Sequence, residues 1–371
     1  MYSLPHSTGV FVIGGGPAGL AAALAARRRG FEVVVADCSV PPVDKACGEG
    51  VMPDGLSAAR SLGLDLESAG GFRFRGIRFH DGESSAQSAF PHGAGLGLRR
   101  TVLHTLMVDR AAAEGVKFAW GARIDGISRE GVSVGGRLVR ARWIVGADGG
   151  HSNVRRWAGL DASHHFSRRF GFRRHYRIAP WSDFMELHWG HACQLYLTPV
   201  SSREVCAVLI SRDPQMRLED ALPRFPEVQR RLAGVGSATA ERGSITASRR
   251  LRSVWRGNVA LIGDASGSVD AITGEGLCLL FQQAVELGAA FEAGDLDRYQ
   301  QAHRRIGRRS EMMADLMLLL DRRHRLRHRV IRAMAASPRL FSQMLAMHVG
   351  ELSPTQFLTN GLALGWRMLT L

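Results

Sequence analysis

The sequence predicts an α/β protein, and three observations along its 371 residues support that prediction. A glycine-rich turn follows the β-rich run Gly9–Ile13 and opens an alanine-rich helix. Two later strand-like runs end in the glycine- and aspartate-containing segments Gly146–Gly149 and Gly263–Ala265. Two strand-rich stretches interrupt the alternation of strands and helices. Alternation predicts a parallel sheet, and the strand-rich stretches predict a second, antiparallel one.

The length and composition are those of a globular protein with a sizeable core. At roughly 100–200 residues per domain, the length favours two units. The chain is 45% hydrophobic and 22% charged, both ordinary values. No run reaches the about 20 apolar residues that cross a bilayer. The first strand follows Met1–Thr8 without a secretory signal pattern, so we expect a cytoplasmic protein.

The cysteines and the charge exclude several classes of protein. The five cysteines are odd in number and lack the short spacings of zinc or redox pairs, so we expect neither a disulfide framework nor a metal site. The net charge of +14 comes almost entirely from arginine, since Lys45 and Lys117 are the only lysines. No nucleic-acid-binding motif accompanies this charge, and we expect no nucleic-acid partner.

The first motif is a complete dinucleotide-binding pattern. Gly14, Gly16 and Gly19 fill G-x-G-x-x-G between a strand and a helix. Gly14 permits the tight turn, Gly16 lets the backbone approach a pyrophosphate, and Gly19 lets the helix pack on the strand. The helix N-terminus, with Pro17 and Ala18, offers free N–H groups to phosphates. Asp37 ends the second strand, where its carboxylate can bind ribose hydroxyls.

Two further strand ends complete the pattern. Trp143–Val145 leads into the segment containing Asp148, and Asn258–Ile262 leads into Gly263 and Asp264. Such strand ends lie at the carboxyl edge of a sheet, where α/β proteins bind ligands. The turn containing Gly274, Gly276 and Leu277 opens a long helix, and its N–H groups can stabilise negative charge on a ligand.

The ordered set GGGPAG, VGADG and GDA resembles the family of FAD enzymes that contains para-hydroxybenzoate hydroxylase and the geranylgeranyl reductases. The resemblance covers residues 9–295 and implies non-covalently bound FAD, with NAD(P)H as electron donor. It implies that Asp264 binds the ribityl chain and that Asp148 serves either cofactor. Arg100, in an R-x-x-L segment, would contact the pyrophosphate or ribityl chain, and Ile124 would lie at the adenine.

The implied architecture is a Rossmann-type FAD domain with an interleaved antiparallel substrate sheet and a C-terminal helical region. The FAD domain is expected over 1–71, 92–165 and 249–295. The substrate domain is expected over 72–91 and 166–248, with helices near Leu218–Leu232. The C-terminal helices would span 296–371, with breaks at Pro338 and Pro354.

The reaction class is left between two alternatives. The loop from Lys45 to Gly50 is similar to the lysine-proline-cysteine-glycine loop of geranylgeranyl reductases, with Ala46 in place of proline. This favours hydride transfer to a C=C bond of an isoprenoid- or polyketide-like molecule. Cys47 would then be catalytic and Gly48 would contact the cofactor. The alternative is NAD(P)H- and oxygen-dependent hydroxylation of an aromatic or quinone-like compound, and a non-catalytic flavin-binding protein is the third hypothesis.

Some residues outside these motifs have competing interpretations. Cys47 could simply pack in its glycine loop, and Glu49 is interpreted as a solvent-facing loop residue rather than a proton donor. The histidines, including His175 and His188, show no metal-ligand spacing and are expected on the surface or in the sheet. The leucine- and arginine-rich C-terminal helices are expected to form core or dimer contacts, with peripheral membrane contact as the alternative. The oligomeric state is left open.

Overall fold

The computed structural model describes residues 4–352, apart from the side chains of residues 163–167. The first of its sheets has eight strands, drawn from distant parts of the described chain, and its main path runs in the order β17-β18-β11-β1-β2-β8. The strands of this path are β1 Ser7–Ile13, β2 Val33–Asp37, β8 Lys117–Trp120, β11 Arg137–Gly146, β17 Trp255–Arg256 and β18 Val259–Leu261. The strands β9 Ile124–Ile127 and β10 Gly131–Val134 extend it through β11. From β18 to β8 the strands are parallel, as the sequence predicts.

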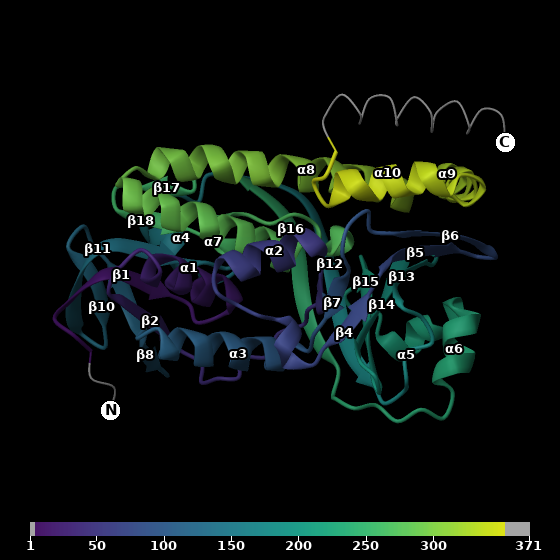
Figure 1. Ribbon diagram of the computed structural model, residues 1–371, viewed down its shortest axis with the longest axis horizontal. Coiled ribbons are helices and arrows are strands. Elements are labelled where there is room, and N and C mark those ends of the chain that lie inside the picture. Colours follow the sequence, from purple (N-terminus) through teal and green to yellow (C-terminus); the bar gives the residue numbers. More distant parts are fainter. Residues whose placement is uncertain (1–3, 353–371) are drawn as a thin grey trace.

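Helices pack together against this parallel sheet (Figure 1). They are α1 Pro17–Arg27, α2 Pro53–Ser61, α3 Arg100–Ala113 and α7 Gly276–Ala293. Gly19 explains the close fit of α1, because a Cβ there would lie 1.8 Å from the Gly14 carbonyl oxygen. Gly14 itself has φ +111°, a conformation that residues with side chains rarely adopt.

The second sheet has seven strands in the order β16-β12-β15-β14-β13-β5-β6. Its strands are β5 Gly76–Asp81, β6 Ser84–Ala89, β12 Ser163–Tyr176, β13 Phe184–Trp189, β14 Cys193–Ser201, β15 Glu204–Ser211 and β16 Arg242–Leu251. All pairs are antiparallel except β5 with β13. The boundaries expected at residues 165/166 and 248/249 therefore fall inside β12 and β16. One face packs against α5 Leu218–Ala221 and α6 Pro226–Leu232.

A small three-stranded sheet lies between the two parts. It pairs β3 Gly50–Val51, β7 Gly95–Gly97 and β4 Phe72–Phe74. The stretch Phe72–Pro91, expected to belong to one substrate sheet, is thus divided between this sheet and the seven-stranded one. The short helix α4 Asn153–Trp157 follows β11, and the 3-10 turns η3 Gly263–Ser266 and η4 Ala271–Thr273 follow β18.

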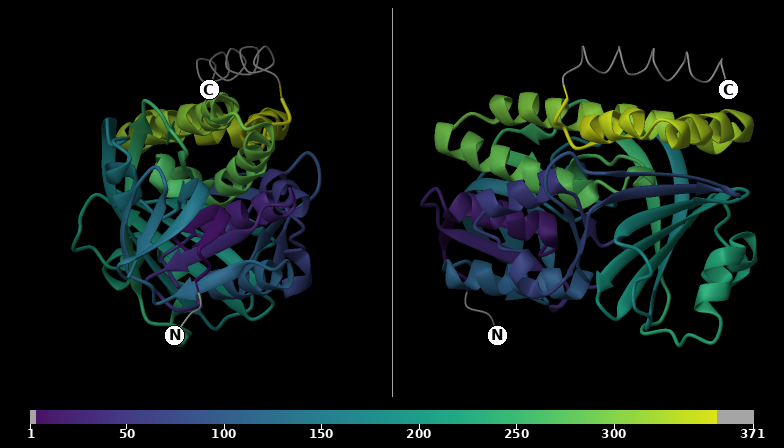
Figure 2. Two further views of the ribbon diagram at one scale, coloured as in Figure 1. Left: turned by 90° about the vertical axis from the view of Figure 1, so that its left-hand side faces the viewer. Right: turned by 45° about the vertical axis from the view of Figure 1, so that its right-hand side comes forward.

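The C-terminal helices form an outer layer on one side of the molecule (Figures 1 and 2). They are α8 Leu296–Arg322, α9 His324–Ala336 and α10 Pro338–His348, so the break at Pro338 is confirmed, whereas Pro354 lies outside the described residues. Val330, Ile331 and Met334 pack with residues of β13 and β14 in one buried cluster. Burying such side chains contributes about 1.5–3 kcal/mol each. Among the described residues, no helix is long and apolar enough to cross a membrane.

Candidate cofactor site

The glycine turn before α1 leaves open space toward Arg100 of α3. Gly16 caps α1 with extended backbone (φ −71°, ψ 176°) and without a side-chain cap, so the first N–H groups of the helix are free. A Cβ on Gly16 would meet one described atom within 4 Å, Arg100 Nη2 at 3.9 Å. The Nε of Arg100 is buried without a hydrogen-bond partner among the described atoms. An anionic group between Gly16 and Arg100 could accept hydrogen bonds from the free N–H groups of α1 and from the Nε–H of Arg100.

His104 supports this turn from α3. Its Nε2 lies 2.8 Å from the carbonyl oxygen of Gly15, and its side chain is fully buried. Burial holds the pKa of His104 below its ordinary value, so the ring is neutral and donates its Nε2–H to that carbonyl. Sequence reasoning missed His104, although its position four residues after Arg100 places both on one face of α3.

The two predicted carboxylates at strand ends differ in their contacts. Asp37 accepts hydrogen bonds from the backbone N–H groups of Gly15 (2.6 Å) and Ser39 (2.7 Å), so it lies at the glycine turn, and its contact with a ribose stays a prediction. Asp148 accepts from Asn153 N at 2.7 Å and from Ser152 Oγ at 2.5 Å, and it therefore caps α4. Its contacts stabilise the fold, and a role for Asp148 in cofactor binding stays a prediction.

The loop at 45–50 and the segment 263–277 form the other half of the site. Lys45 Nζ lies 3.2 Å from Asp264 Oδ2, and both side chains are about half exposed. A Cβ on Gly48 or on Gly276 would meet no described atom within 4 Å. The helix α7 begins at Gly276 without a side-chain cap. The free space at these glycines can accommodate a flat ligand, and the uncapped N-terminus of α7 can donate hydrogen bonds to its polar edge.

Three further residues that were predicted to contact the cofactor differ in their surroundings. Gly263 has φ +60°, and its N–H donates to Gln283 Oε1 at 2.9 Å. Leu277 is 5% exposed and belongs to the core of the first sheet. Ile124 begins β9 and is half-buried. The adenine contact expected at Ile124 stays a prediction.

A buried polar network holds the turn before α7, and sequence reasoning missed it. Asp270 Oδ1 accepts from Ile272 N at 3.0 Å and pairs with Arg169 Nη2 at 3.3 Å. The hydroxyl of Tyr196 donates to the carbonyl oxygen of Ile272 at 2.6 Å. Arg169 also pairs with Asp321 of α8 at 3.5 Å. The second sheet and α8 thus fix the turn that is expected to face the cofactor.

The interpretation of Glu49 as a solvent-facing residue is wrong. Glu49 is 1% exposed, and its Oε2 lies 2.6 Å from His175 Nε2. Its Oε1 accepts from Arg100 N and from Arg173 Nη1, both at 2.9 Å. Glu49 has φ +58°, a left-handed conformation that costs a residue with a side chain about 1 kcal/mol or more. The ion pair between Glu49 and Arg173 of β12 offsets this strain and fixes the loop beside Arg100.

Asp44 extends this ion-pair network. Arg173 binds both its carboxylate oxygens at 2.9 Å. Burial acts to raise the pKa of Asp44, but the hydrogen bond and charge of Arg173 outweigh it and leave this pKa below its ordinary value. Asp44 therefore stays ionised near neutral pH, as a buried arginine requires.

The thiol of Cys47 turns back into its own loop. Its Sγ accepts a hydrogen bond from the backbone N–H of Glu49 at 3.4 Å, and the side chain packs against the core. The buried thiol of Cys206 donates toward the Cys47 carbonyl oxygen at 3.8 Å. This geometry matches the packing interpretation of Cys47 better than a thiol presented to a substrate.

Two groups of potential metal ligands meet only in the folded chain. They are Glu49, His175 and Cys206, and His80, Glu186 and His188. In each group the carboxylate is already paired with an arginine, Arg173 at 2.9 Å or Arg78 at 3.1 Å. Burial lowers the pKa of His80 to about 4, so this ring is neutral near pH 7. The arginines supply the positive charge that a metal ion would otherwise provide, and we propose a metal at neither group.

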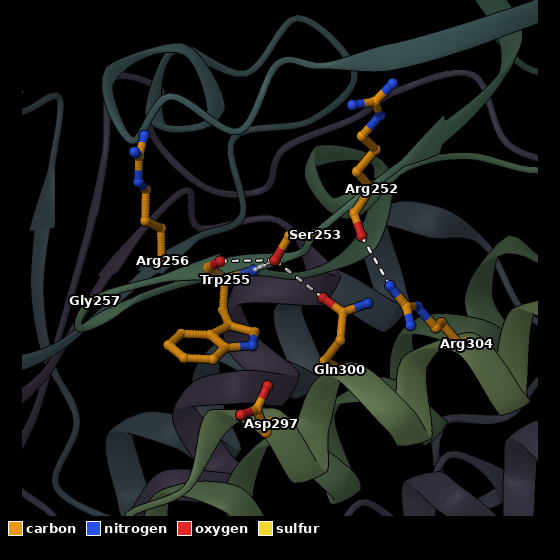
Figure 3. Close-up of a pocket in the computed structure, with 8 residues that line it drawn as sticks. All are labelled: Arg252, Ser253, Trp255, Arg256, Gly257, Asp297, Gln300 and Arg304. Atoms are coloured by element: carbon orange, nitrogen blue, oxygen red, sulfur yellow. Dashed lines mark hydrogen bonds between the residues drawn. The ribbon is translucent and has the colours of Figure 1, made fainter.

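A separate hollow of about 450 Å³ lies between the start of α8 and the β16–β17 connection. Trp255, Arg252, Arg256 and Arg304 contribute to its lining. In Figure 3 the guanidinium groups of Arg252 and Arg256 extend away from the Trp255 ring. The hollow adjoins β17, at the far edge of the sheet from β8, and is distinct from the glycine turn.

Comparison with known proteins identifies the family. Residues 7–309 match the family described as FAD binding domain, and the chain belongs to it. Together with the open glycine cradle and Arg100, this defines an FAD-dependent oxidoreductase.

Individual relatives include a hydroxylase and a reductase. The chain is 28% identical over 370 residues to an FAD-dependent urate hydroxylase of Klebsiella pneumoniae, covering 85% of this chain and 90% of the relative. It is 28% identical over 308 residues to a menaquinone reductase of Mycobacterium tuberculosis, covering 74% of each. The fold is shared with a flavoprotein/dehydrogenase from Cytophaga hutchinsonii, at TM-score 0.85, 17% identity and 98% coverage of both chains.

Proposed function

We propose that this protein hydroxylates a hydrophobic aromatic or quinone-like small molecule, with NAD(P)H as electron donor and dioxygen as the source of oxygen. We favour hydroxylation over C=C reduction because of the position of the Cys47 thiol. The Cys47 Sγ accepts a hydrogen bond from the Glu49 N–H of its own loop and packs against the core, which supports a packing role for this side chain. The match to the urate hydroxylase, which covers more of both chains than the match to the menaquinone reductase, also supports it.

The residues present fit FAD. Gly16 and Arg100 would hold the pyrophosphate, Asp37 the adenosine ribose and Asp264 the ribityl chain. The backbone N–H groups at Gly276 would face the pyrimidine edge of the flavin, where they stabilise negative charge on reduction. When bound, FAD would supply a hydride acceptor for the electron donor and, in its reduced form, reactivity toward dioxygen.

The residues near this turn favour an apolar substrate. A Cβ on Gly274 would lie 3.9 Å from the Met52 Cε and 4.0 Å from the Met185 Cε. The side chain of Ile272 is buried in the cluster that includes Leu187 and Trp189 of β13. Methionine and leucine side chains exclude water and adapt to irregular apolar ligands. The chain would thus bind and orient a hydrophobic ring while keeping solvent away.

The test follows the product of turnover. The FAD-loaded protein is incubated with NADPH, isotopically labelled dioxygen and a panel of naphthols, naphthoquinones and phenols, and the products are analysed by mass spectrometry. The proposal predicts a product that has gained one labelled oxygen atom. A product that has gained two hydrogen atoms, also formed without dioxygen, would contradict it.

The second candidate function is reduction of a C=C bond of an isoprenoid-like molecule. The loop Lys45–Gly50 and the menaquinone reductase relative favour it. It requires Cys47 to turn toward the substrate. Menaquinone is therefore included in the panel, and loss of its reduction in the Cys47→Ala variant would support this candidate.

A further inference from the structure

The surface of α9 and the adjoining helix ends is rich in exposed arginine. The segment 322–339 contains seven arginines and no aspartate or glutamate. Six of these side chains are exposed, and no ion-pair partner is described for them: Arg322, Arg323, Arg325, Arg329, Arg332 and Arg339. We call these six residues the arginine surface. With +7 of the formal net charge of +14, the segment holds half the excess charge in 18 residues.

The packing of α9 directs these arginine side chains toward the solvent. Arg325, Arg329 and Arg332 are spaced by four and three residues, so they share one face of α9. The opposite face buries Val330, Ile331 and Met334. The buried Arg327 binds Asp81 of β5 at 3.0 Å and anchors the helix. Because α9 cannot rotate without exposing this apolar face, the arginine surface is a fixed feature of the molecule.

Apolar side chains adjoin the arginines in the same outer layer. On α8, Met312 and Leu319 are 42% and 46% exposed, among the few exposed large hydrophobic residues described. They share one face of the helix with the exposed Arg308 and Arg322, which lie on either side of them, and the exposed Asp315, which pairs with Arg250, lies between them. Arginines that flank exposed methionine and leucine are typical of helices that lie at a lipid interface. Contacts to nucleic acid would favour polar or stacking aromatic side chains instead.

We propose that the arginine surface docks this protein onto an anionic lipid membrane. The charges bind lipid phosphates, and Met312 and Leu319 insert among the headgroups. The buried side of α9 covers β5 and β6 of the second sheet, so docking places the membrane over the sheet that we assign to the substrate. This inference stands independently of the reaction class.

The experiment measures binding of the full-length, FAD-loaded protein to vesicles by sedimentation. The vesicles contain either phosphatidylcholine alone or phosphatidylcholine with roughly a third phosphatidylglycerol. The test variant carries Arg325→Gln, Arg329→Gln and Arg332→Gln. The control variant removes the same charge from exposed arginines elsewhere, with Arg129→Gln, Arg203→Gln and Arg230→Gln. Flavin content and thermal unfolding verify that all three proteins are folded.

The proposal predicts binding to the anionic vesicles, weakening with salt, and little binding to neutral ones. Each arginine near the surface changes partitioning by about fivefold, so the test variant should bind on the order of 100-fold more weakly. The control variant should bind like the wild type. Failure of the wild type to bind anionic vesicles, equal losses in both variants, or tighter binding to duplex DNA than to vesicles would overturn the proposal.

Discussion

Replacing Gly16 with alanine should separate cofactor binding from folding. The backbone at Gly16 suits alanine, and the new Cβ would approach one described atom within 4 Å, Arg100 Nη2 at 3.9 Å. The stability of the apoprotein should therefore change by less than about 0.5 kcal/mol. The methyl group would, however, occupy the space that a phosphate needs between the turn and Arg100.

The expected loss of affinity follows from the contacts displaced. A hydrogen bond between a charged phosphate and an N–H group contributes about 1.5–3 kcal/mol, and the phosphate would also move relative to Arg100. We expect FAD to bind about 3 kcal/mol more weakly, or roughly 100-fold in Kd.

The assay titrates apoprotein with FAD by fluorescence and follows urea unfolding without cofactor. Gly236→Ala is the matched control, because Gly236 is also open but lies outside the site, and it should change neither quantity. Gly19→Ala should instead lower apoprotein stability, since its Cβ would lie 1.8 Å from the Gly14 oxygen. A Gly16→Ala protein with a Kd within about threefold of wild type would refute this placement of the pyrophosphate.

Other substitutions test the surrounding network. Glu49→Gln leaves the buried Arg173 with one carboxylate partner and should cost about 3 kcal/mol in urea unfolding; an unchanged midpoint would show that the buried ion pair is unimportant. Tyr196→Phe removes the 2.6 Å hydrogen bond to Ile272 O. It should cost about 1–2 kcal/mol and weaken FAD binding, and normal values for both would contradict the assigned role of the turn. Burial, and then the charge of Arg304, lowers the pKa of His303 from 6.5 to about 4. The unfolded chain therefore binds this proton first as the pH falls, so stability should drop between pH 6.5 and 4 by about 1.4 kcal/mol per unit. His303→Gln should remove that part of the slope, and a variant that keeps the wild-type slope would contradict the shift.

Local patterns allowed much of the fold to be predicted. The strand, glycine turn, helix and acid at the N-terminus each follow from nearby residues, and in the structure Asp37 at the end of β2 bonds to the glycine turn. The Pro338 break and the second sheet were predictable in the same way. The exact ends of β12 and β16 were not, because pairing between these two strands carries both past the sequence-based boundaries.

The residues that sequence reasoning misjudged depend on distant partners. Glu49 looks like an exposed loop residue until β12 brings Arg173 and His175 to it. Arg169 and Tyr196 support the turn at Ile272, but both lie far from it in the sequence, so no local pattern could have predicted these contacts.

The most direct test of the proposed hydroxylation follows the flavin itself. The FAD-loaded protein is reduced with NADPH in the absence of air and then mixed with dioxygen, while flavin absorbance reports reoxidation and the product is collected from the labelled-oxygen reaction. The account predicts rapid reoxidation coupled to one labelled oxygen atom in the product, unchanged in the Cys47→Ala variant. Slow reoxidation, with reduction of a C=C bond that is lost in Cys47→Ala, would contradict it.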